Sequence, residues 1–310
     1  MEIVGESRMM CEVLGRAEQL ADVPRPILIR GERGTGKELL ASFVHANSAR
    51  STGPFAAVNC AVYSDELLAS ELFGHEKGAF TGADARRAGC IERAEGGTLF
   101  LDEIGNMSPR FQEKMLRVIE TRQFERVGGT ESLTADVRFI SATNADIQSL
   151  IDAGEFRADF HDRIAFDTLD LPPLRERKDD VPLLVRHFSV LLLSEVPNLE
   201  IRRFSPEAMR LMTEYYWPGN VRELKNVVER LQLREGEPVI NTAELPQEIT
   251  AAAPSGETFE EKVEAYRQHL ILSAWRDCAF NQRKAAEKLG MSYDQFRHYF
   301  RKYGLKELLP

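Results

Sequence analysis

The fold is decided by one stretch, Gly31-Glu32-Arg33-Gly34-Thr35-Gly36-Lys37, which follows a short apolar run and opens a helical pattern. Glycines at this spacing let backbone N–H groups close around phosphate oxygens. The N-terminus of the following helix adds positive potential, and Lys37 can reach the β- and γ-phosphates as a point charge. Because strand, loop and helix occur in this order, the stretch predicts a P-loop rather than a glycine turn with an exposed lysine. The next residue, Glu38, offers no hydroxyl to Mg²⁺.

Short apolar runs alternate with helical patterns around this loop, through about residue 170. The runs are bounded by Gly, Pro or Asn, as short strands are. This alternation predicts an α/β fold with a mostly parallel sheet and helices on both faces. The predicted strands are 26–30, 55–58, 98–101 and 137–140, and one helical pattern between them is 111–120.

Two adjacent acids, Asp102 and Glu103, end one of these apolar strands. We expect Asp102 to hold Mg²⁺ and Glu103 to polarise the attacking water, because phosphoryl transfer needs positioning and charge neutralisation. Taken alone, the two acids are also consistent with a helix cap. Polar residues end the neighbouring strands as well. Asn59 is predicted to hold Glu103 by a hydrogen bond until nucleotide is sensed, and Thr143-Asn144 to report on the γ-phosphate, although each is also an ordinary strand-end residue.

The sequence pattern changes near residue 178. Helical spacing at 181–195, 206–216 and 221–230 predicts a small helical subdomain. The following stretch is rich in Pro, Glu, Thr and Ala and is predicted to be a linker. The predicted domains are an α/β nucleotide-binding subdomain at 1–172, a helical lid at 173–234, the linker at 235–256 and a C-terminal domain at 257–310.

The stretch Gly78-Ala79-Phe80-Thr81-Gly82-Ala83 favours neither helix nor strand, because two glycines bracket an aromatic residue and a threonine. It predicts a mobile loop that presents Phe80 and Thr81. An exposed phenylalanine is unfavourable in water, so such a loop usually awaits a partner. A glycine-rich turn with Phe80 packed in the core is the alternative, and periodicity does not exclude it.

The stretch 78–83 and three others, 156–163, 171–177 and 217–230, resemble the bacterial enhancer-binding proteins, the AAA+ activators of sigma-54-dependent transcription. The resemblance covers essentially the whole chain. The P-loop and residues 280–290 look most like the phage-shock branch of that family. The resemblance implies an AAA+ P-loop sheet, an α-helical lid and a Fis-type helix–turn–helix. It also accounts for Glu38, since the family carries glutamate after its P-loop lysine.

The family's activity would be ATP hydrolysis in an oligomeric ring, a hexamer by resemblance. Hydrolysis would move loop 78–83 against sigma-54 and open the closed RNA polymerase complex at the promoter. The cofactors implied are ATP and Mg²⁺. The sigma-54 contact residues implied are Gly78, Ala79, Phe80, Thr81, Gly82 and Ala83, and the ATP-binding residues implied are Gly31, Glu32, Arg33, Gly34, Thr35, Gly36, Lys37, Glu38, Asn144 and Arg222.

Three arginines take roles only through the resemblance, because without the motifs each would be interpreted as a surface residue. Arg157 and Arg163 match the arginine-finger region, which acts in trans on a neighbour's ATP, and on one helix they would point in different directions. Arg222 matches the sensor arginine of the lid. It is predicted in the first turn of a helix capped by Asn220, where a cation opposes the helix dipole. The predicted catalytic residues are thus Asp102, Glu103, Asn59, Arg157 and Arg163, with Asp102 as the metal ligand.

Charge is divided unevenly along the 310 residues. The last thirty carry seven basic and three acidic residues, a net +4, so the preceding 280 carry −13 of the total of −9. Gly290 suits a turn between two helices, 282–289 and 293–303, whose basic bias favours DNA binding over a hairpin that only packs. Residues 259–275 are predicted to supply a dimer helix. The expected enhancer-DNA contacts are Tyr293, Gln295, Arg297, His298 and Arg301.

Composition favours a cytoplasmic protein without membrane insertion. The four cysteines, at positions 11, 60, 90 and 278, show no disulfide or zinc spacing, and the apolar stretch 181–196 is interrupted by charge. About 25 residues precede the first strand, too few for a receiver domain of roughly 100 residues. We therefore expect an inhibitory protein in trans, of the phage shock protein A type by resemblance. The alternatives are a DNA-binding repressor or sensor with a vestigial ATPase, and a general AAA+ remodeller; both fit poorly with an intact 78–83 stretch.

Overall fold

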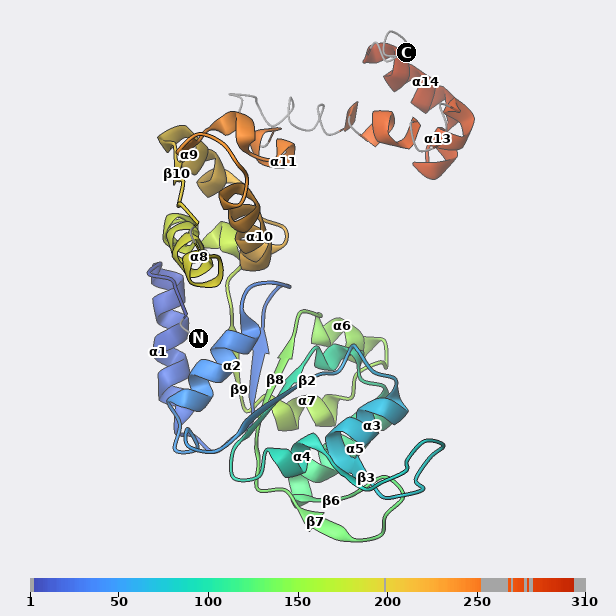
Figure 1. Ribbon diagram of the computed structural model, residues 1–310. Helices are drawn as coiled ribbons and strands as arrows, with labels where there is room; N and C mark the ends of the chain where they lie inside the picture. The colour runs from blue at the N-terminus through green and yellow to red at the C-terminus, as the bar shows by residue number, and fades with distance from the viewer. Residues whose placement is uncertain are drawn as a thin grey trace. The chain divides into compact units, whose positions relative to one another are not determined.

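The computed structural model describes residues 3–197, 199–251, 267–268, 270–275, 278 and 281–303. The chain divides into two compact units, Met1–Ala252 and Ala253–Pro310, each of which is described by itself. Figure 1 labels their elements. Within the described ranges, no helix combines the length and the apolar character that crossing a bilayer requires.

A five-stranded sheet lies at the centre of the first unit, in the order β2-β5-β8-β1-β9, with every neighbouring pair parallel (Figure 1). The prediction of a parallel sheet is confirmed. Asn59 lies opposite Asp102 in the register, and Arg30 lies opposite Thr143, so the polar strand ends meet at one edge. The strands are β1 (Ile27–Arg30), β2 (Phe55–Asn59), β5 (Thr98–Asp102), β8 (Arg138–Thr143) and β9 (Asp167–Asp170).

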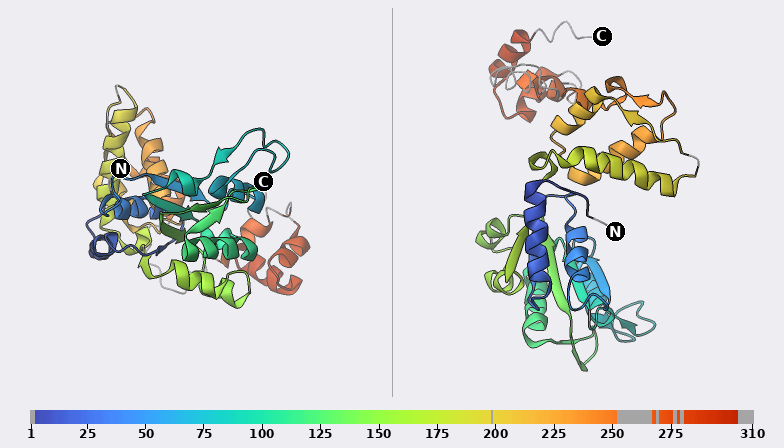
Figure 2. Two further views of the ribbon diagram at one scale, coloured as in Figure 1. Left: turned by 90° about the horizontal axis from the view of Figure 1, so that it is seen from below. Right: turned by 90° about the vertical axis from the view of Figure 1, so that its left-hand side faces the viewer.

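Helices cover both faces of this sheet, as predicted (Figure 2). Successive strand residues alternate between two apolar cores: Ile27 and Ile29 pack on one face, and Leu28 packs on the other. This period of two is the geometry of an extended chain. The first face is covered by α1 (Arg8–Ala21) and α2 (Lys37–Ala46), and the second by α3 (Asp65–Phe73), α4 (Cys90–Arg93), α5 (Pro109–Thr121), α6 (Ile147–Asp152) and α7 (Ala158–Ile164).

Two short hairpins extend from the second face. One pairs β3 (Gly74–His75) with β4 (Arg87–Ala88), and the other pairs β6 (Gln123–Glu125) with β7 (Ser132–Thr134). An isolated bridge between His75 and Val127 joins the two hairpins. The stretch 78–83 therefore lies at the end of the first hairpin, against the second. The sequence patterns did not indicate either hairpin, because strands of two or three residues carry no usable periodicity.

The lid consists of η2 (Leu174–Glu176), α8 (Asp180–Glu195), α9 (Pro206–Glu214) and α10 (Asn220–Gln232), close to the predicted helices. The predicted linker differs from the structure. Its described part contains β11 (Val239–Ile240), paired with β10 (Arg203–Phe204), followed by η3 (Thr242–Glu244) and α11 (Gln247–Ala251). Buried Ile240, Leu245 and Ile249 attach these elements to the lid, although the local composition resembles a loop.

The described part of the second unit contains α13 (Gln282–Lys288) and α14 (Tyr293–Lys302). Gly290 has a φ of 65° in the turn between them, and the Ser292 side chain accepts a hydrogen bond from the N–H of Gln295, so the predicted turn and cap are confirmed. Buried Ala285, Ala286 and Phe296 form the core of this helix pair. The predicted dimer helix, 259–275, lies largely outside the described residues.

Candidate nucleotide site

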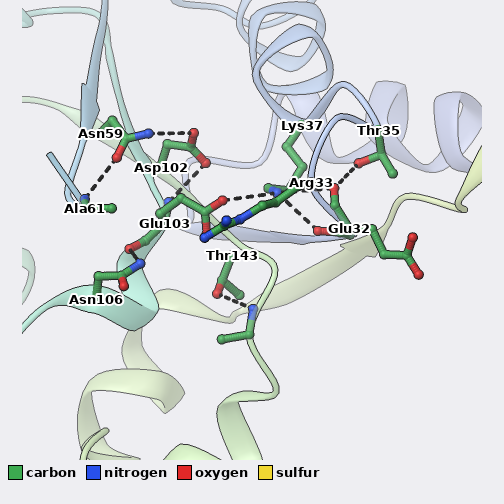
Figure 3. A network of polar contacts seen from close by, with 12 residues as sticks. Glu32, Arg33, Thr35, Lys37, Asn59, Ala61, Asp102, Glu103, Asn106 and Thr143 are labelled. Carbon is green, nitrogen blue, oxygen red and sulfur yellow. Dashed lines mark hydrogen bonds and ion pairs between the residues drawn. The ribbon is translucent and has the colours of Figure 1, made fainter. Parts of the chain in front are cut away.

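The phosphate-binding loop joins β1 to α2 at the polar edge of the sheet. Gly34 and Gly36 have φ angles of 79° and 107°, a region that favours glycine. The Lys37 side chain, only 7% exposed, donates to the backbone oxygens of Gly31 (3.1 Å) and Glu32 (3.5 Å). Figure 3 shows its ammonium turned toward the acids at the end of β5. The structure therefore gives the loop the strand, turn and helix context that the sequence predicts.

The two acids lie at the end of β5, which β8 separates from β1 in the sheet, and Glu103 faces the lysine (Figure 3). Glu103 Oε1 lies 3.8 Å from Lys37 Nζ, while Glu103 Oε2 is buried without a hydrogen-bond partner among the described residues. Burial, and then the neighbouring Glu103 carboxylate, raise the pKa of Asp102. A site with clustered carboxylate oxygens and an unpartnered buried oxygen fits a hard divalent cation such as Mg²⁺. Three or more grouped metal-ligating side chains do not occur in the described parts of the chain, so substrate oxygens or water would have to complete the coordination.

Asn59 does not hold Glu103, and this part of the prediction is wrong. Its amide nitrogen donates to Asp102 Oδ2 at 3.4 Å, and its oxygen accepts from the N–H of Ala61 at 2.9 Å. The parallel register places Asn59 directly opposite Asp102, whereas Glu103 follows the strand in a left-handed conformation with a φ of 54°. That turn directs the Glu103 side chain toward Lys37 instead.

The next strand end is occupied by Thr143 and Asn144. Thr143 is fully buried, and its hydroxyl accepts from the N–H of Ala145 at 3.0 Å. Asn144 is exposed. Asn144 is therefore the one of these two residues whose side chain is exposed at the polar edge of the sheet, near Asp102 and Glu103.

The lid contacts the phosphate-binding loop through the start of α10. The N–H of Arg222 donates to the Gly34 oxygen at 3.3 Å, and Arg222 lies in the first turn as predicted, with an exposed side chain. The predicted Asn220 cap is wrong: Gly219 is the N-cap, and Asn220 is the first helical residue, fully buried. The Asn220 side-chain oxygen accepts from the Leu174 N–H at 2.8 Å, and its amide nitrogen donates to the phosphate-binding loop, so neither caps the helix. The Gly219 N–H donates to Glu223 Oε2 at 2.8 Å.

The arginines of the predicted finger region lie at opposite ends of one short helix. Arg157 precedes α7 and pairs with Asp159 at 2.7 Å, whereas Arg163 lies in the last turn, 3.9 Å from Glu120. Their side chains are 39% and 51% exposed, so both are accessible to a neighbouring molecule. Both guanidinium groups pair with these surface acids rather than with the phosphate-binding loop.

Phe80 lies at the tip of the first hairpin and is 43% exposed. The alternative in which it packs in the core is therefore wrong. Its ring contacts His75 edge-on at 5.0 Å between centroids, and Gly78 and Gly82 both have positive φ angles. Thr81 is exposed beside it. The stretch thus presents an aromatic ring and a hydroxyl on a glycine-bounded turn.

Sequence reasoning missed two arginines that hold the phosphate-binding loop from outside. Arg175 forms a bidentate pair with Glu32, at 2.6 and 2.8 Å, and Arg177 donates to the Thr35 oxygen at 3.0 Å. The hydrogen bonds from Arg175 are the largest cause of the lowered pKa of Glu32, which is about 2. The only available signal was their place in the stretch 171–177, which the family resemblance marked without giving either residue a role.

Four of the basic residues of the second unit lie close together on α14. Arg297, His298, Arg301 and Lys302 of α14 line a concave surface of about 490 Å³. Arg283 of α13 lies over the Tyr293 ring at 5.4 Å, so the two helices are joined near the start of α14. Three of the five predicted DNA contacts, Arg297, His298 and Arg301, lie on this cationic surface.

Comparison with known proteins extends along nearly the whole chain. Residues 3–170 match the Sigma-54 interaction domain, and residues 175–262 match the AAA+ ATPase lid domain. The chain is 43% identical to the Psp operon transcriptional activator of Escherichia coli K12, covering 97% of both, and 45% identical to the transcriptional regulatory protein ZraR of Klebsiella oxytoca, covering 94% of this chain and 66% of that protein. Crystal structures of NtrX from Brucella abortus, in complex with ADP and with ATP, each match with a TM-score of 0.74 at 34% identity, over 98% of this chain and 69% of NtrX.

Proposed function

This chain belongs to the family of sigma-54-dependent AAA+ transcriptional activators, and from that membership we propose that it couples ATP hydrolysis to opening of the sigma-54 RNA polymerase complex at a promoter. The observation that carries this proposal is the convergence of Lys37, Asp102 and Glu103 on one edge of the sheet. Phe80 and Thr81 of loop 78–83, exposed on the same unit, support an output to a protein partner, whereas Ala83 of the loop is buried. Likeness to the Psp operon activator supports a role in the phage-shock response.

Each residue of the site has a separate task in this proposal. Backbone N–H groups of residues 31–36 bind phosphate oxygens, and Lys37 exchanges the Gly31 and Glu32 oxygens for the terminal phosphates. Asp102 is the residue that would hold Mg²⁺, which would neutralise phosphate charge. Glu103 orients the attacking water and accepts its proton. Asn59, tied to Asp102, and exposed Asn144 sense which nucleotide is present.

The remaining contacts to ATP are proposed to come from the lid, from the start of α2 and from a neighbouring subunit. Arg222 extends from the lid toward the phosphates, and Glu38 lies in the first turn of α2, where an acid is favourable. Arg157 and Arg163 contact the ATP of the next subunit in a ring, for which their exposure is suited. A hexameric ring is the assembly we propose, and an inhibitor of the phage shock protein A type is the proposed trans regulator. A co-purification in which no partner changes the ATPase rate would contradict that regulator.

The direct test of this function is ATP-dependent open-complex formation with sigma-54 holoenzyme on a matched promoter, followed by permanganate reactivity of the melted DNA. We expect melting only with ATP, the protein and sigma-54 together. A reaction that replaces sigma-54 with the housekeeping sigma factor is the control. Equal melting without ATP, or with either sigma factor, would contradict the proposed function.

Replacing Thr81 by alanine is expected to leave ATP turnover within about twofold of the unaltered protein while open-complex formation falls by at least roughly tenfold. The Thr81 side chain is exposed on the hairpin, so its loss removes a hydroxyl from a partner contact without opening a cavity in the core. Phosphate release and promoter melting would be measured on the same preparation. Normal melting by this variant would show that the loop is not the contact.

DNA binding is proposed for the helix pair α13 and α14, which the family resemblance predicts to be a Fis-type helix–turn–helix. Tyr293, Gln295, Arg297, His298 and Arg301 are the proposed contacts. Replacing Arg297 and Arg301 by alanine should weaken binding to enhancer DNA and reduce the slope of log affinity against log salt by about 2, because each phosphate contact contributes about one counterion. ATP turnover should not change. An unaltered salt slope would remove these two residues from the interface.

A further inference from the structure

Three consecutive backbone oxygens of the phosphate-binding loop accept hydrogen bonds from outside the loop. The Arg33 oxygen accepts from the Asn220 amide at 3.1 Å, the Gly34 oxygen from the Arg222 N–H at 3.3 Å, and the Thr35 oxygen from the Arg177 guanidinium at 3.0 Å. A carbonyl oxygen turned toward a bound phosphate would repel it, since both carry negative charge. The three bonds hold these oxygens on the side of their donors.

Asn220 is at the centre of this arrangement. It is fully buried, and its whole amide is used: the oxygen accepts from the Leu174 N–H at 2.8 Å, and the nitrogen donates to Glu32 Oε2 at 3.0 Å as well as to Arg33. Its φ of 52° is in the left-handed region, which asparagine tolerates better than most residues. The surroundings therefore fix both its backbone and its side chain.

Glu32 completes the contact from the loop side. Its two carboxylate oxygens accept from both terminal nitrogens of Arg175, whose guanidinium lies 4.7 Å from the centre of the exposed Tyr216 ring. A bidentate pair of this kind fixes direction as well as distance. Glu32 is thus held on one side by η2 and on the other by the start of α10.

The backbone of the phosphate-binding loop is also in direct contact with the backbone of the lid at Gly219. A Cβ atom added to Gly34 would lie 2.3 Å from the Gly219 oxygen. Because that oxygen belongs to the backbone, the overlap cannot be removed by rotating a side chain. The middle glycine of the loop is therefore required for contact with the lid, in addition to its positive φ. A displacement of the lid start must act directly on the loop at this point.

We infer that Glu32, Arg175 and Asn220, hereafter the lid brace, are positioning residues that hold the phosphate-binding loop in the shape that receives phosphate. The lid brace makes loop shape and lid position change together, through contacts that do not involve the Arg222 side chain. Without it, ATP binding must also order the loop, and that ordering reduces affinity. The inference rests on the proposed ATPase function and adds a task that the nucleotide-contacting residues do not perform.

The test is Asn220→Asp in the full chain. Aspartate keeps the size, the tolerance of positive φ and the bond from Leu174, but it loses both donors and places a carboxylate against Glu32. We expect the dissociation constant for ATP, measured by calorimetry, to rise by roughly tenfold or more, and KM to rise more than kcat falls. Asn226→Asp, an exposed position on the same helix, is the matched control and should bind ATP like the unaltered protein.

A second variant separates the lid brace from a general loss of stability. Glu32→Gln removes the charge that pairs with Arg175, at a partly exposed position, and should raise the dissociation constant by about threefold. In the Glu32→Gln background, Asn220→Asp should have a smaller effect than alone, because the two carboxylates no longer face each other. Circular dichroism and thermal unfolding would show whether each variant is folded.

The outcomes are distinct. The inference would be overturned if the Asn220→Asp variant is folded and binds ATP within twofold of the Asn226→Asp variant. It would also be overturned if Asn220→Asp raises the dissociation constant for ATP by the same factor with and without Glu32→Gln. If Asn220→Asp does not fold, unchanged ATP binding by Glu32→Gln would overturn it. Failure of the unaltered protein to bind ATP would instead overturn the proposed function, and the inference with it.

Discussion

Lys37→Ala is expected to abolish ATP turnover, with a fall of about 10³-fold or more in the hydrolysis rate. Lys37 is the cation that faces Glu103 at 3.8 Å, and it is 93% removed from solvent by the loop and the strand ends. Alanine leaves the Gly31 and Glu32 oxygens and the Glu103 carboxylate without this cation. The phosphates of ATP would then enter a site that keeps the Asp102 and Glu103 carboxylates but lacks this lysine.

Phosphate release and calorimetric titration with ATP would measure this effect, and both should be at the detection limit. Binding of the same full-length variant to enhancer DNA should stay normal, because the proposed DNA contacts lie in the second unit. Lys114→Ala, an exposed lysine on α5, is the matched control. Turnover by Lys37→Ala above about a tenth of the unaltered rate would exclude a phosphate-contacting role for this lysine.

Glu103→Gln should stop hydrolysis while ATP binding is retained. Glutamine has nearly the same shape, so the left-handed turn after β5 and the neighbouring Asp102 stay in place. It cannot accept the proton of the attacking water, a loss that typically reduces the rate by about 10² to 10⁴. Removing one negative charge from beside Lys37 should also make ATP binding equal or tighter.

A matched control separates loss of the Glu103 carboxylate from the general effect of removing one negative charge. Glu113→Gln, an exposed acid on α5, should hydrolyse ATP normally. Single-turnover hydrolysis and ATP affinity would be measured for both variants and for Asp102→Asn, which should lose the dependence on Mg²⁺ concentration seen in the unaltered protein. Glu103→Gln with near-normal turnover would mean that another group activates the water.

The sequence by itself determined the central sheet and the position of the phosphate-binding loop. These are local properties: alternating burial has a period of two, the helices have a period near 3.6, and glycines are required where φ is positive. The apolar runs around Leu28 and Phe100 accordingly lie in the sheet, and the acids lie at its polar edge. The exposed turn at Phe80 was also indicated locally, by its two flanking glycines.

Only the tertiary structure decided which polar side chains meet. Asn220 and Glu32 are 188 residues apart in the sequence, and Arg175 and Glu32 are 143 apart, so no local pattern can pair them. The same holds for Asn59, whose partner was set by strand register rather than by chemistry, since both acids at the end of β5 can accept its amide. Hydrogen bonds depend on distances of a few tenths of an ångström, and the packing of lid against loop fixes those distances only once the chain has folded.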